Sequence, residues 1–224
     1  MLPRILPFAL FMAFIGLDEL IRFLAARGLL AVPNNFPYFL YPVKALAVAL
    51  VIIFFWSRYQ EIRLRDLARF RDTALSLFIG VVVFFLWIRM DWTFGTFGTP
   101  QGFNPTIIAD PFTRSLIIGS RIAGAVIVVP VMEELFWRSF LLRYLIGNDF
   151  EKVPIGTFTW GSFLICTVLF GLEHNFFIAG MMAGVAYNVL LYVTRSISQC
   201  ILAHAVTNLL LGIYVLQTGR WHFW

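Results

Sequence analysis

The stretch VPVMEELFWRSFLLR, residues 129–143, places two adjacent carboxylates and an arginine inside an otherwise apolar segment. A charged side chain at membrane depth costs roughly 2.5–3.5 kcal/mol on insertion scales, so such groups are kept mainly where they pair or line a functional cavity. Glu134 and Arg138 stand four residues apart, and on a helix this spacing predicts an ion pair on one face. Glu133 lies about 100° away around the helix. The pattern therefore predicts that Glu134 has a structural role and that Glu133 is available to face another group.

The composition is that of an integral membrane protein. Of the 224 residues, 60% are hydrophobic and 13% are charged, with a mean hydropathy of +0.84, whereas a soluble domain is about 45–50% apolar and about 25% charged. Almost no sequence is left for a soluble part, so a single domain over residues 1–224 is expected. The net charge of +5 is compatible with nucleic-acid binding, but the arginines mostly flank apolar spans, which favours membrane orientation as its cause.

The apolar segments define the expected fold class. About 20 mostly apolar residues are needed to cross a bilayer, and by this measure the sequence predicts an all-α, polytopic transmembrane helical bundle of about seven spans. The start of the chain resembles a signal peptide, but the later spans favour an uncleaved first helix. The predicted spans are residues 5–26, 39–56, 73–90, 112–146, 155–172, 176–193 and 196–216.

Two spans carry local signals. The span over residues 112–146 is longer than the bilayer is thick at 1.5 Å per residue, and Pro130, which lacks a backbone donor, is expected to kink or break it just before the two glutamates. A tilted or broken helix is therefore predicted. In the sixth span, Gly180 and Gly184 are four residues apart, and this spacing is typical of a close helix-packing face.

The connecting segments differ in charge. Residues 58–72 hold five arginines and are expected to form a solvated cytoplasmic loop with a short surface helix, whereas residues 91–110 contain no lysine or arginine. By the positive-inside rule the N-terminus then lies in the cytoplasm and, after seven spans, the C-terminus lies outside. The location we expect is the bacterial inner membrane.

Two further polar clusters lie in or beside the later spans. His174 follows Phe170 by four residues, and His204 and Asn208 are also four apart, so each pair shares a helix face. At 1.5 Å per residue, Glu133 and His174 lie at similar depths in antiparallel helices, while the depth of His204 fits less well. Either histidine alone is more often a hydrogen-bonded helix contact, but together with Glu133 they indicate a site.

These residue types are sufficient to hydrolyse an amide. Glu133 and His174 can deprotonate a shared water for attack on a carbonyl. An imidazole N–H from His204 and an amide N–H from Asn208 can hold the oxyanion of the tetrahedral intermediate. The sequence contains neither a G-x-S-x-G motif nor the H-E-x-x-H motif of zinc proteases, which favours this assignment over serine or ordinary zinc hydrolysis.

Three motifs in this order resemble a known family. They are Glu-Glu-x-x-x-Arg at residues 133–138, Phe-x-x-x-His at residues 170–174 and His-x-x-x-Asn at residues 204–208. The chain is similar in them to the CPBP family, which comprises the CAAX prenyl proteases, bacteriocin-processing and immunity proteins, and related glutamic intramembrane proteases. The resemblance covers about residues 112–216.

What the resemblance implies is an intramembrane endopeptidase, a hydrolase that cuts near the C-terminal lipidated or membrane-anchored part of a substrate. Residues 1–111 would supply three accessory spans, and residues 112–216 the catalytic core. The expected partners are such a protein or peptide and the lipid bilayer, with no nucleic acid, no cofactor and no metal. The catalytic residues carried over are Glu133 and His174, which activate water, and His204 and Asn208, which form the oxyanion site, with Glu134 and Arg138 in support.

Three alternatives stay open. Glu173 stands before His174, where family members often have an apolar residue, so it can orient His174 or compete with Glu133 as the base; the paired carboxylates favour Glu133. Two histidines and one carboxylate are also a valid zinc ligand set, and Glu133, His174 and His204 would then form a zinc-dependent membrane protease. A non-enzymatic immunity or binding protein would use the same polar network.

Overall fold

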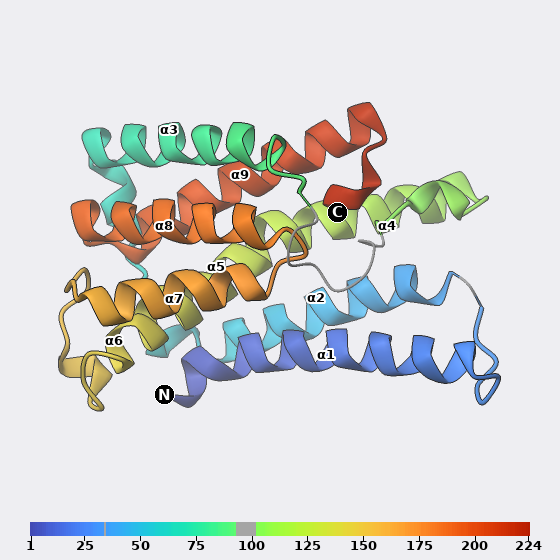
Figure 1. Cartoon of the computed structure of the whole chain (residues 1–224), viewed down its shortest axis with the longest axis horizontal. Coiled ribbons are helices and arrows are strands. Elements are labelled where there is room, and N and C mark those ends of the chain that lie inside the picture. Colours follow the sequence, from blue (N-terminus) through green and yellow to red (C-terminus); the bar gives the residue numbers. More distant parts are fainter. Residues whose placement is uncertain (34, 93–101) are drawn as a thin grey trace.

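The computed structural model describes residues 1–33, 35–92 and 102–224 of the chain. Within these ranges every regular element is a helix, which confirms the all-α fold class. Figure 1 shows the long helices lying side by side in a bundle. Their bounds are α1 Leu2–Ala26, α2 Phe36–Phe54, α3 Phe70–Trp87, the continuous helix α4–α6 over Pro111–Tyr144, α7 Trp160–Leu172, α8 Phe177–Thr194 and α9 Ile197–Thr218.

These helical stretches correspond to the seven predicted spans. In the described part of the chain, five of them are long and apolar enough to cross a membrane, namely α2, α3, α4–α6, α8 and α9. α1 is long enough but carries charged side chains in its second half, and α7 has only 13 residues. Single turns of 3-10 helix lie at Trp56–Arg58, Leu64–Ala68, Pro105–Ile107, Phe150–Lys152 and Trp221–Phe223.

α7 begins five residues later than the sequence predicted. The Thr159 hydroxyl accepts a hydrogen bond from the Ser162 amide at 3.2 Å and so caps the helix before Trp160. Gly156, just upstream, has φ +81°, a backbone conformation that glycine adopts without strain. The apolar residues before Trp160 therefore form a turn that the hydropathy pattern alone does not distinguish from helix.

The helix that carries both glutamates is not broken at Pro130. Two π-helical segments join α4, α5 and α6 into one continuous helix, and one of them ends immediately before α5. A π turn contains an extra residue, so the helix accommodates the amide that proline lacks without ending. In Figure 1 this helix crosses the bundle obliquely, as a long span must if it is to fit the bilayer. The successive elements are α4 Pro111–Ala123, π-helical Gly124–Val128, α5 Val129–Glu134, π-helical Leu135–Leu141 and α6 Leu142–Tyr144.

Small residues let the later helices approach closely. Gly80 of α3 lies so near α9 that a Cβ added to it would stand 2.6 Å from the carbonyl oxygen of Ala203. Gly180 and Gly184 of α8 both face α7, and a Cβ on Gly180 would lie 3.0 Å from Gly171 Cα. The predicted packing face of α8 is thus confirmed. Close backbone contact fixes α9, which carries His204, and α7, which ends two residues before His174.

A buried ion pair fixes the start of α1 to the long helix. Glu61, in the loop before α3, accepts hydrogen bonds from Arg4 Nε at 2.7 Å and Arg4 Nη2 at 3.0 Å, and from the Ser139 hydroxyl at 2.5 Å. Arg143 donates to the same hydroxyl at 3.0 Å. The expectation of a solvated loop over residues 58–72 is therefore wrong for Glu61, which is buried because its partner lies on a distant helix.

We expect Glu61 to make stability sensitive to acid. Burial raises the pKa of its carboxyl, but the hydrogen bonds from Arg4 and Ser139 lower it, and the pKa lies below the ordinary value of 4.5. Such a carboxylate stabilises the fold above the unfolded-state pKa and loses this contribution as the pH falls through the folded-state pKa. In the range below pH 4.5, the melting temperature in detergent should decrease as the pH is lowered. Glu61→Gln should make this decrease smaller.

Glu151→Gln is the matched control. Glu151 also pairs with Arg4, at 3.2 Å, but its side chain is 62% exposed, and exposed ion pairs contribute little to stability. This control should retain the acid-dependent decline of the wild type. A Glu61→Gln protein that declines as steeply as the wild type would contradict the assignment.

Candidate active site

Three helices bring the sequence-predicted residues to one cavity. The cavity has a volume of about 200 Å³ and is lined by Glu133 of α5, His174 just after α7, and His204 and Asn208 of α9. Aromatic side chains of Trp87, Phe170 and Tyr187 line other parts of the same wall. Acid, base and amide groups therefore face a partly apolar space inside the bundle.

Glu134 and Arg138 form the ion pair that their spacing predicted. Arg138 Nη1 lies 3.2 Å from Glu134 Oε1, and both side chains are at most 1% exposed. Arg138 Nε also donates to Asn188 Oδ1 of α8 at 3.2 Å, and its guanidinium lies 4.3 Å from the centre of the Phe170 ring. A buried charge needs a partner and further hydrogen bonds, and this pair has both.

His204 lies between the two adjacent glutamates. Its Nδ1 is 2.9 Å from Glu134 Oε1, and its Nε2 is 3.9 Å from Glu133 Oε2. The ring stacks on Tyr187 with centroids 5.0 Å apart. An Nδ1–H that donates to Glu134 leaves Nε2 facing Glu133 and the cavity. The sequence did not predict the bond to Glu134, because helix spacing gives no register between α5 and α9.

His174 is held by the last turn of α7, the helix that precedes it. Its Nδ1 lies 2.7 Å from the carbonyl oxygen of Phe170, so Nδ1 carries the proton and Nε2 keeps a lone pair in the neutral ring. The Phe170–His174 spacing in the sequence thus has a structural reason. An imidazole oriented in this way can accept a proton at Nε2.

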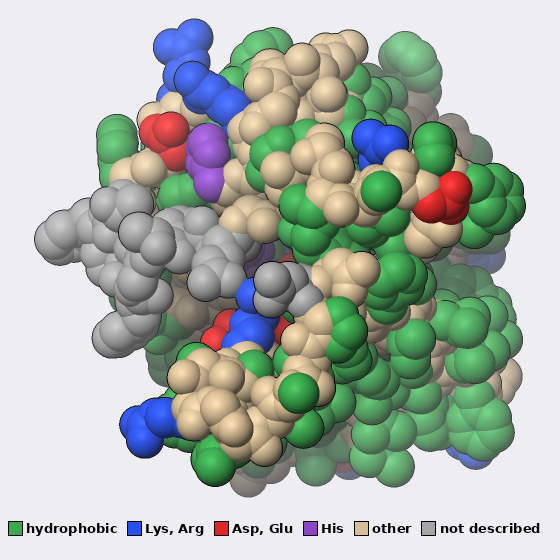
Figure 2. All heavy atoms as spheres, turned by 90° about the vertical axis from the view of Figure 1, so that its right-hand side faces the viewer, with side chains coloured by type: hydrophobic (Ala, Val, Ile, Leu, Met, Phe, Trp, Pro, Cys, Tyr) green, Lys and Arg blue, Asp and Glu red, His purple; other side chains and the backbone are tan. Residues whose placement is uncertain are grey.

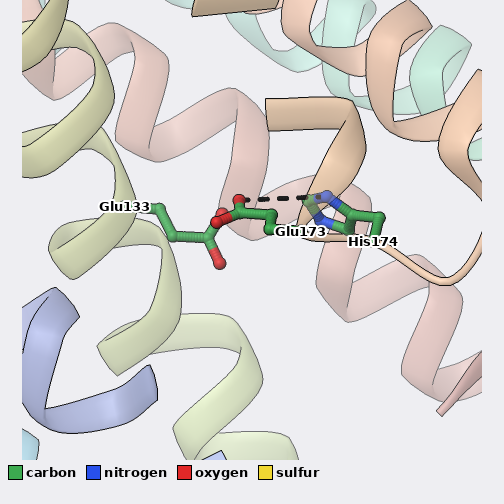
Figure 3. A group of neighbouring side chains, drawn as sticks. All are labelled: Glu133, Glu173 and His174. Atoms are coloured by element: carbon green, nitrogen blue, oxygen red, sulfur yellow. Dashed lines mark ion pairs between the residues drawn. The ribbon is translucent and has the colours of Figure 1, made fainter. Parts of the chain in front are cut away.

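Glu173 lies between Glu133 and His174. Figure 3 shows the Glu173 carboxyl group pointing toward Glu133 on one side and toward the His174 ring on the other. Its Oε1 accepts a hydrogen bond from Trp137 Nε1 at 3.1 Å and is 3.8 Å from His174 Nδ1. The second distance exceeds a hydrogen bond, so Phe170, rather than Glu173, orients the imidazole. Glu173 joins the site because it is the first residue after α7, and the chain there directs the side chains of Glu173 and His174 toward Glu133.

Glu133, Glu173 and His174 form a group, within the described residues, that could hold a metal ion. One potential ligand atom from each of Glu133, Glu173 and His174 lies within 4.8 Å of the others. This set differs from the predicted zinc ligands, because Glu173 takes the place of His204. His204 Nδ1 is bonded to Glu134, and its other nitrogen is 3.9 Å from Glu133.

Asn208 and Glu133 each keep hydrogen-bonding capacity for a ligand. The Asn208 amide donates one hydrogen bond at 2.8 Å to the carbonyl oxygen of Ala125, in the π-helical segment before α5, and a side-chain amide has a second N–H. Glu133 Oε2 is buried and finds no hydrogen-bond partner among the residues that the structure describes. A carboxylate oxygen facing the cavity in this way is available to bind and deprotonate a water.

Comparison with known proteins identifies the region that carries these residues. The family model described as "Type II CAAX prenyl endopeptidase Rce1-like" matches residues 115–210, which include Glu133, His174, His204 and Asn208. The resemblance to the CPBP family is therefore confirmed over this region, and it supports a CAAX-type protease, a hydrolase, in the membrane. No curated protein and no solved structure matches the chain.

We expect the two neighbouring glutamates to differ in their effect on stability. Glu134→Ala leaves the buried guanidinium of Arg138 without its carboxylate, a loss of roughly 3–5 kcal/mol, and also removes the acceptor for His204. Glu133→Ala removes a carboxylate that is not paired with an arginine in the described residues, and it should lower the stability of the protein less. The measurement is thermal unfolding of both variants in the same detergent. A larger fall in melting temperature for Glu133→Ala would contradict the structural role of Glu134.

Proposed function

We propose that this chain, which carries the Rce1-like CAAX prenyl endopeptidase region over residues 115–210, is an intramembrane endopeptidase that uses a glutamate-activated water. Residues 112–216 would form its catalytic core, and residues 1–111 would supply three accessory spans. Its substrates would be proteins or peptides held at the bilayer by a lipid or a membrane anchor and cut near their C-terminal part. We infer that it lies in a bacterial inner membrane, and the charge pattern of the loops supports an N-terminus in the cytoplasm.

One observation carries the proposal: Glu133, whose Oε2 has no hydrogen-bond partner among residues 1–33, 35–92 and 102–224, lines a cavity that two histidines and an asparagine also line. Hydrolysis of an amide needs a general base and donors for the oxyanion within reach of one reacting carbon. Glu133 lies within 4.8 Å of His174 and 3.9 Å from His204. Such distances allow direct hydrogen bonding or bonding through a single water once substrate is bound.

The catalytic cycle follows from these positions. Glu133, assisted by His174 Nε2, takes a proton from the water while the water oxygen forms a bond to the scissile carbonyl carbon. The resulting oxyanion accepts hydrogen bonds from the free Asn208 N–H and from His204 Nε2–H in the imidazolium form, whose other N–H is held by Glu134. Collapse of the tetrahedral intermediate breaks the C–N bond, and the proton held by Glu133 passes to the departing amine.

Catalysis should depend on Glu133 and Asn208 to different degrees. Glu133→Gln should abolish cleavage of a membrane-anchored fluorogenic peptide, because an amide cannot accept the proton. Asn208→Ala removes one oxyanion donor, which typically costs ~2.7–4 kcal/mol or about 10²–10³ in rate, and should slow cleavage by that factor. The purified protein in detergent or nanodiscs is assayed by product formation.

Exposed residues of the same types provide the controls. Glu19→Gln on α1 and Asn148→Ala in the loop after α6 change exposed side chains that do not line the active-site cavity, so both variants should cleave at the wild-type rate. Full activity of Glu133→Gln would exclude Glu133 as the base.

A metal-dependent protease is a second candidate, and one observation favours it: the close grouping of Glu133, Glu173 and His174. Three protein ligands and one open position are typical of catalytic zinc. The same assay separates the two mechanisms. Activity that survives a chelator supports the glutamate mechanism, whereas activity lost to the chelator and restored by zinc, with Glu173→Gln unable to retain zinc, supports the metal enzyme.

A further inference from the structure

We propose that a cavity at the end of the bundle where α1 begins binds the phosphate of an anionic lipid headgroup. The cavity has a volume of about 830 Å³ and shares no lining residue with the candidate active site. Figure 1 shows the N-terminal start of α1 and α6 at this end of the bundle. The volume lies within the usual range of about 300–1,000 Å³ for ligand sites. This site is separate from the proposed protease chemistry and does not depend on it.

Basic side chains outnumber acidic ones around this cavity. Five arginines line it, against the three carboxylates of Glu61, Asp66 and Glu151, which leaves a net charge of +2. Glu61 and Glu151 are both paired with Arg4, at 2.7 Å and 3.2 Å. Asp66 accepts a hydrogen bond from the Ser196 hydroxyl at 2.6 Å. The carboxylates therefore have partners of their own, and the excess positive charge favours an anionic ligand.

Three of the lining arginines, Arg58, Arg63 and Arg195, have exposed side chains. All twelve acidic residues of the sequence lie in the ranges that the structure describes, and none of them forms an ion pair with these three arginines there. Arg63 Nε donates one hydrogen bond, to the carbonyl oxygen of Gln60 at 3.3 Å. A guanidinium has five N–H donors, so each of the three can still bind a ligand.

The backbone that carries Arg58 and Arg63 is fixed, although the side chains are exposed. The carbonyl oxygen of Arg58 accepts a hydrogen bond from Arg4 Nη2 at 3.3 Å. The amide of Arg63 donates to the hydroxyl of Ser198, at the start of α9, at 2.8 Å. A binding site whose parts are already in place loses less entropy when a ligand binds. The loop is therefore prepared to present two guanidinium groups.

Arg195 has a backbone conformation that is typical of glycine. It ends α8 with φ 50° and is the only non-glycine residue with positive φ among the described residues. α9 ends in the same left-handed conformation at Gly219, with φ 70°. Glycine adopts this conformation without strain, whereas a Cβ makes it unfavourable. The backbone at residue 195 would favour glycine, so the arginine is explained by its side chain, which lines the cavity.

The surroundings of the cavity place it at the depth of lipid headgroups. Phe55 and Ile155 line it, and the exposed tryptophans Trp56 and Trp160 follow them closely in the chain. Exposed tryptophans are typical of the membrane–water interface. Figure 2 looks at the bundle from the opposite end and shows hydrophobic side chains over much of one flank, at the right of the view. Acyl chains can pack on such a surface.

A lipid phosphate matches this lining in charge and in polarity. Arginine binds phosphate oxygens with two parallel hydrogen bonds, and three exposed arginines line one cavity here. Apolar side chains of Leu2, Val153 and Ile155 line it as well, and they suit the glycerol and the first acyl carbons of a lipid. The loop charges predict that this end faces the cytoplasm, where the membrane surface carries anionic lipids.

The test measures the binding of phosphatidylglycerol with a fluorescent acyl chain to the purified, delipidated protein in dodecyl maltoside. Arg63→Gln and Arg195→Gly should each weaken this binding about tenfold, because each variant removes charge-assisted hydrogen bonds. Arg65→Gln is the matched control, since Arg65 is an exposed arginine of the same loop that does not line the cavity. This control should keep the wild-type affinity.

Arg195→Gly separates lipid binding from folding. Without lipid, this variant should melt at the wild-type temperature or above it, because glycine adopts positive φ without strain. Added phosphatidylglycerol should raise the melting temperature of the wild type, since a ligand of the folded state stabilises it. The rise should be smaller for Arg195→Gly, and an equal rise in both proteins would contradict the inference.

Three further results would overturn the inference. Equal affinity of the wild type for phosphatidylcholine, which carries no net charge, would exclude a site for anionic lipid. An equal loss of binding in Arg65→Gln and Arg63→Gln would assign the binding to the general surface charge. Displacement of the labelled lipid by inorganic phosphate at the concentration at which unlabelled phosphatidylglycerol displaces it would assign the cavity to a soluble phosphate. None of these measurements requires peptide cleavage, so the protease function and the lipid site can fail independently.

Discussion

The hydrogen-bonded chain Arg138–Glu134–His204 is the interaction on which the site depends. Its bonds of 3.2 Å and 2.9 Å connect the long helix to α9, and the Arg138–Asn188 bond extends the connection to α8. Each of these groups is buried, and a buried charge without a partner would cost several kcal/mol. The helices that carry the reacting groups can therefore adopt only arrangements that keep this chain intact.

This constraint explains why two adjacent glutamates have different environments. Each of them has one carboxylate oxygen, Oε2, with no hydrogen-bond partner in the described residues. Glu134 is held through its other oxygen by Arg138 and His204, whereas Glu133, one residue earlier, lines the cavity. Neighbouring residues on a helix point about 100° apart, so one can be fixed while the other stays open to substrate. Catalysis requires reacting groups in a fixed position, and the hydrogen bonds of Glu134 hold the helix that carries Glu133.

The sequence was sufficient for those parts of the structure that depend on local patterns. Apolar segments predicted the helical bundle, and the four-residue spacing of Glu134 and Arg138 predicted their ion pair. The bond between His204 and Glu134 could not be predicted, because it depends on how α5 and α9 are aligned in space. The position of Glu173 depends on where α7 ends, and the continuity of the helix through Pro130 depends on a π-helical segment, which hydropathy does not show.

The central claim is that water, activated by Glu133, attacks the scissile carbonyl without a covalent intermediate. The most direct measurement is the mass of the N-terminal product when the purified protein cleaves its peptide in hydroxylamine, which intercepts any acyl-enzyme. The account predicts only the carboxylic acid in the product and no covalent adduct on the protein. A hydroxamate product would contradict it, because it would show that a serine, a cysteine or Glu133 itself had formed an acyl-enzyme.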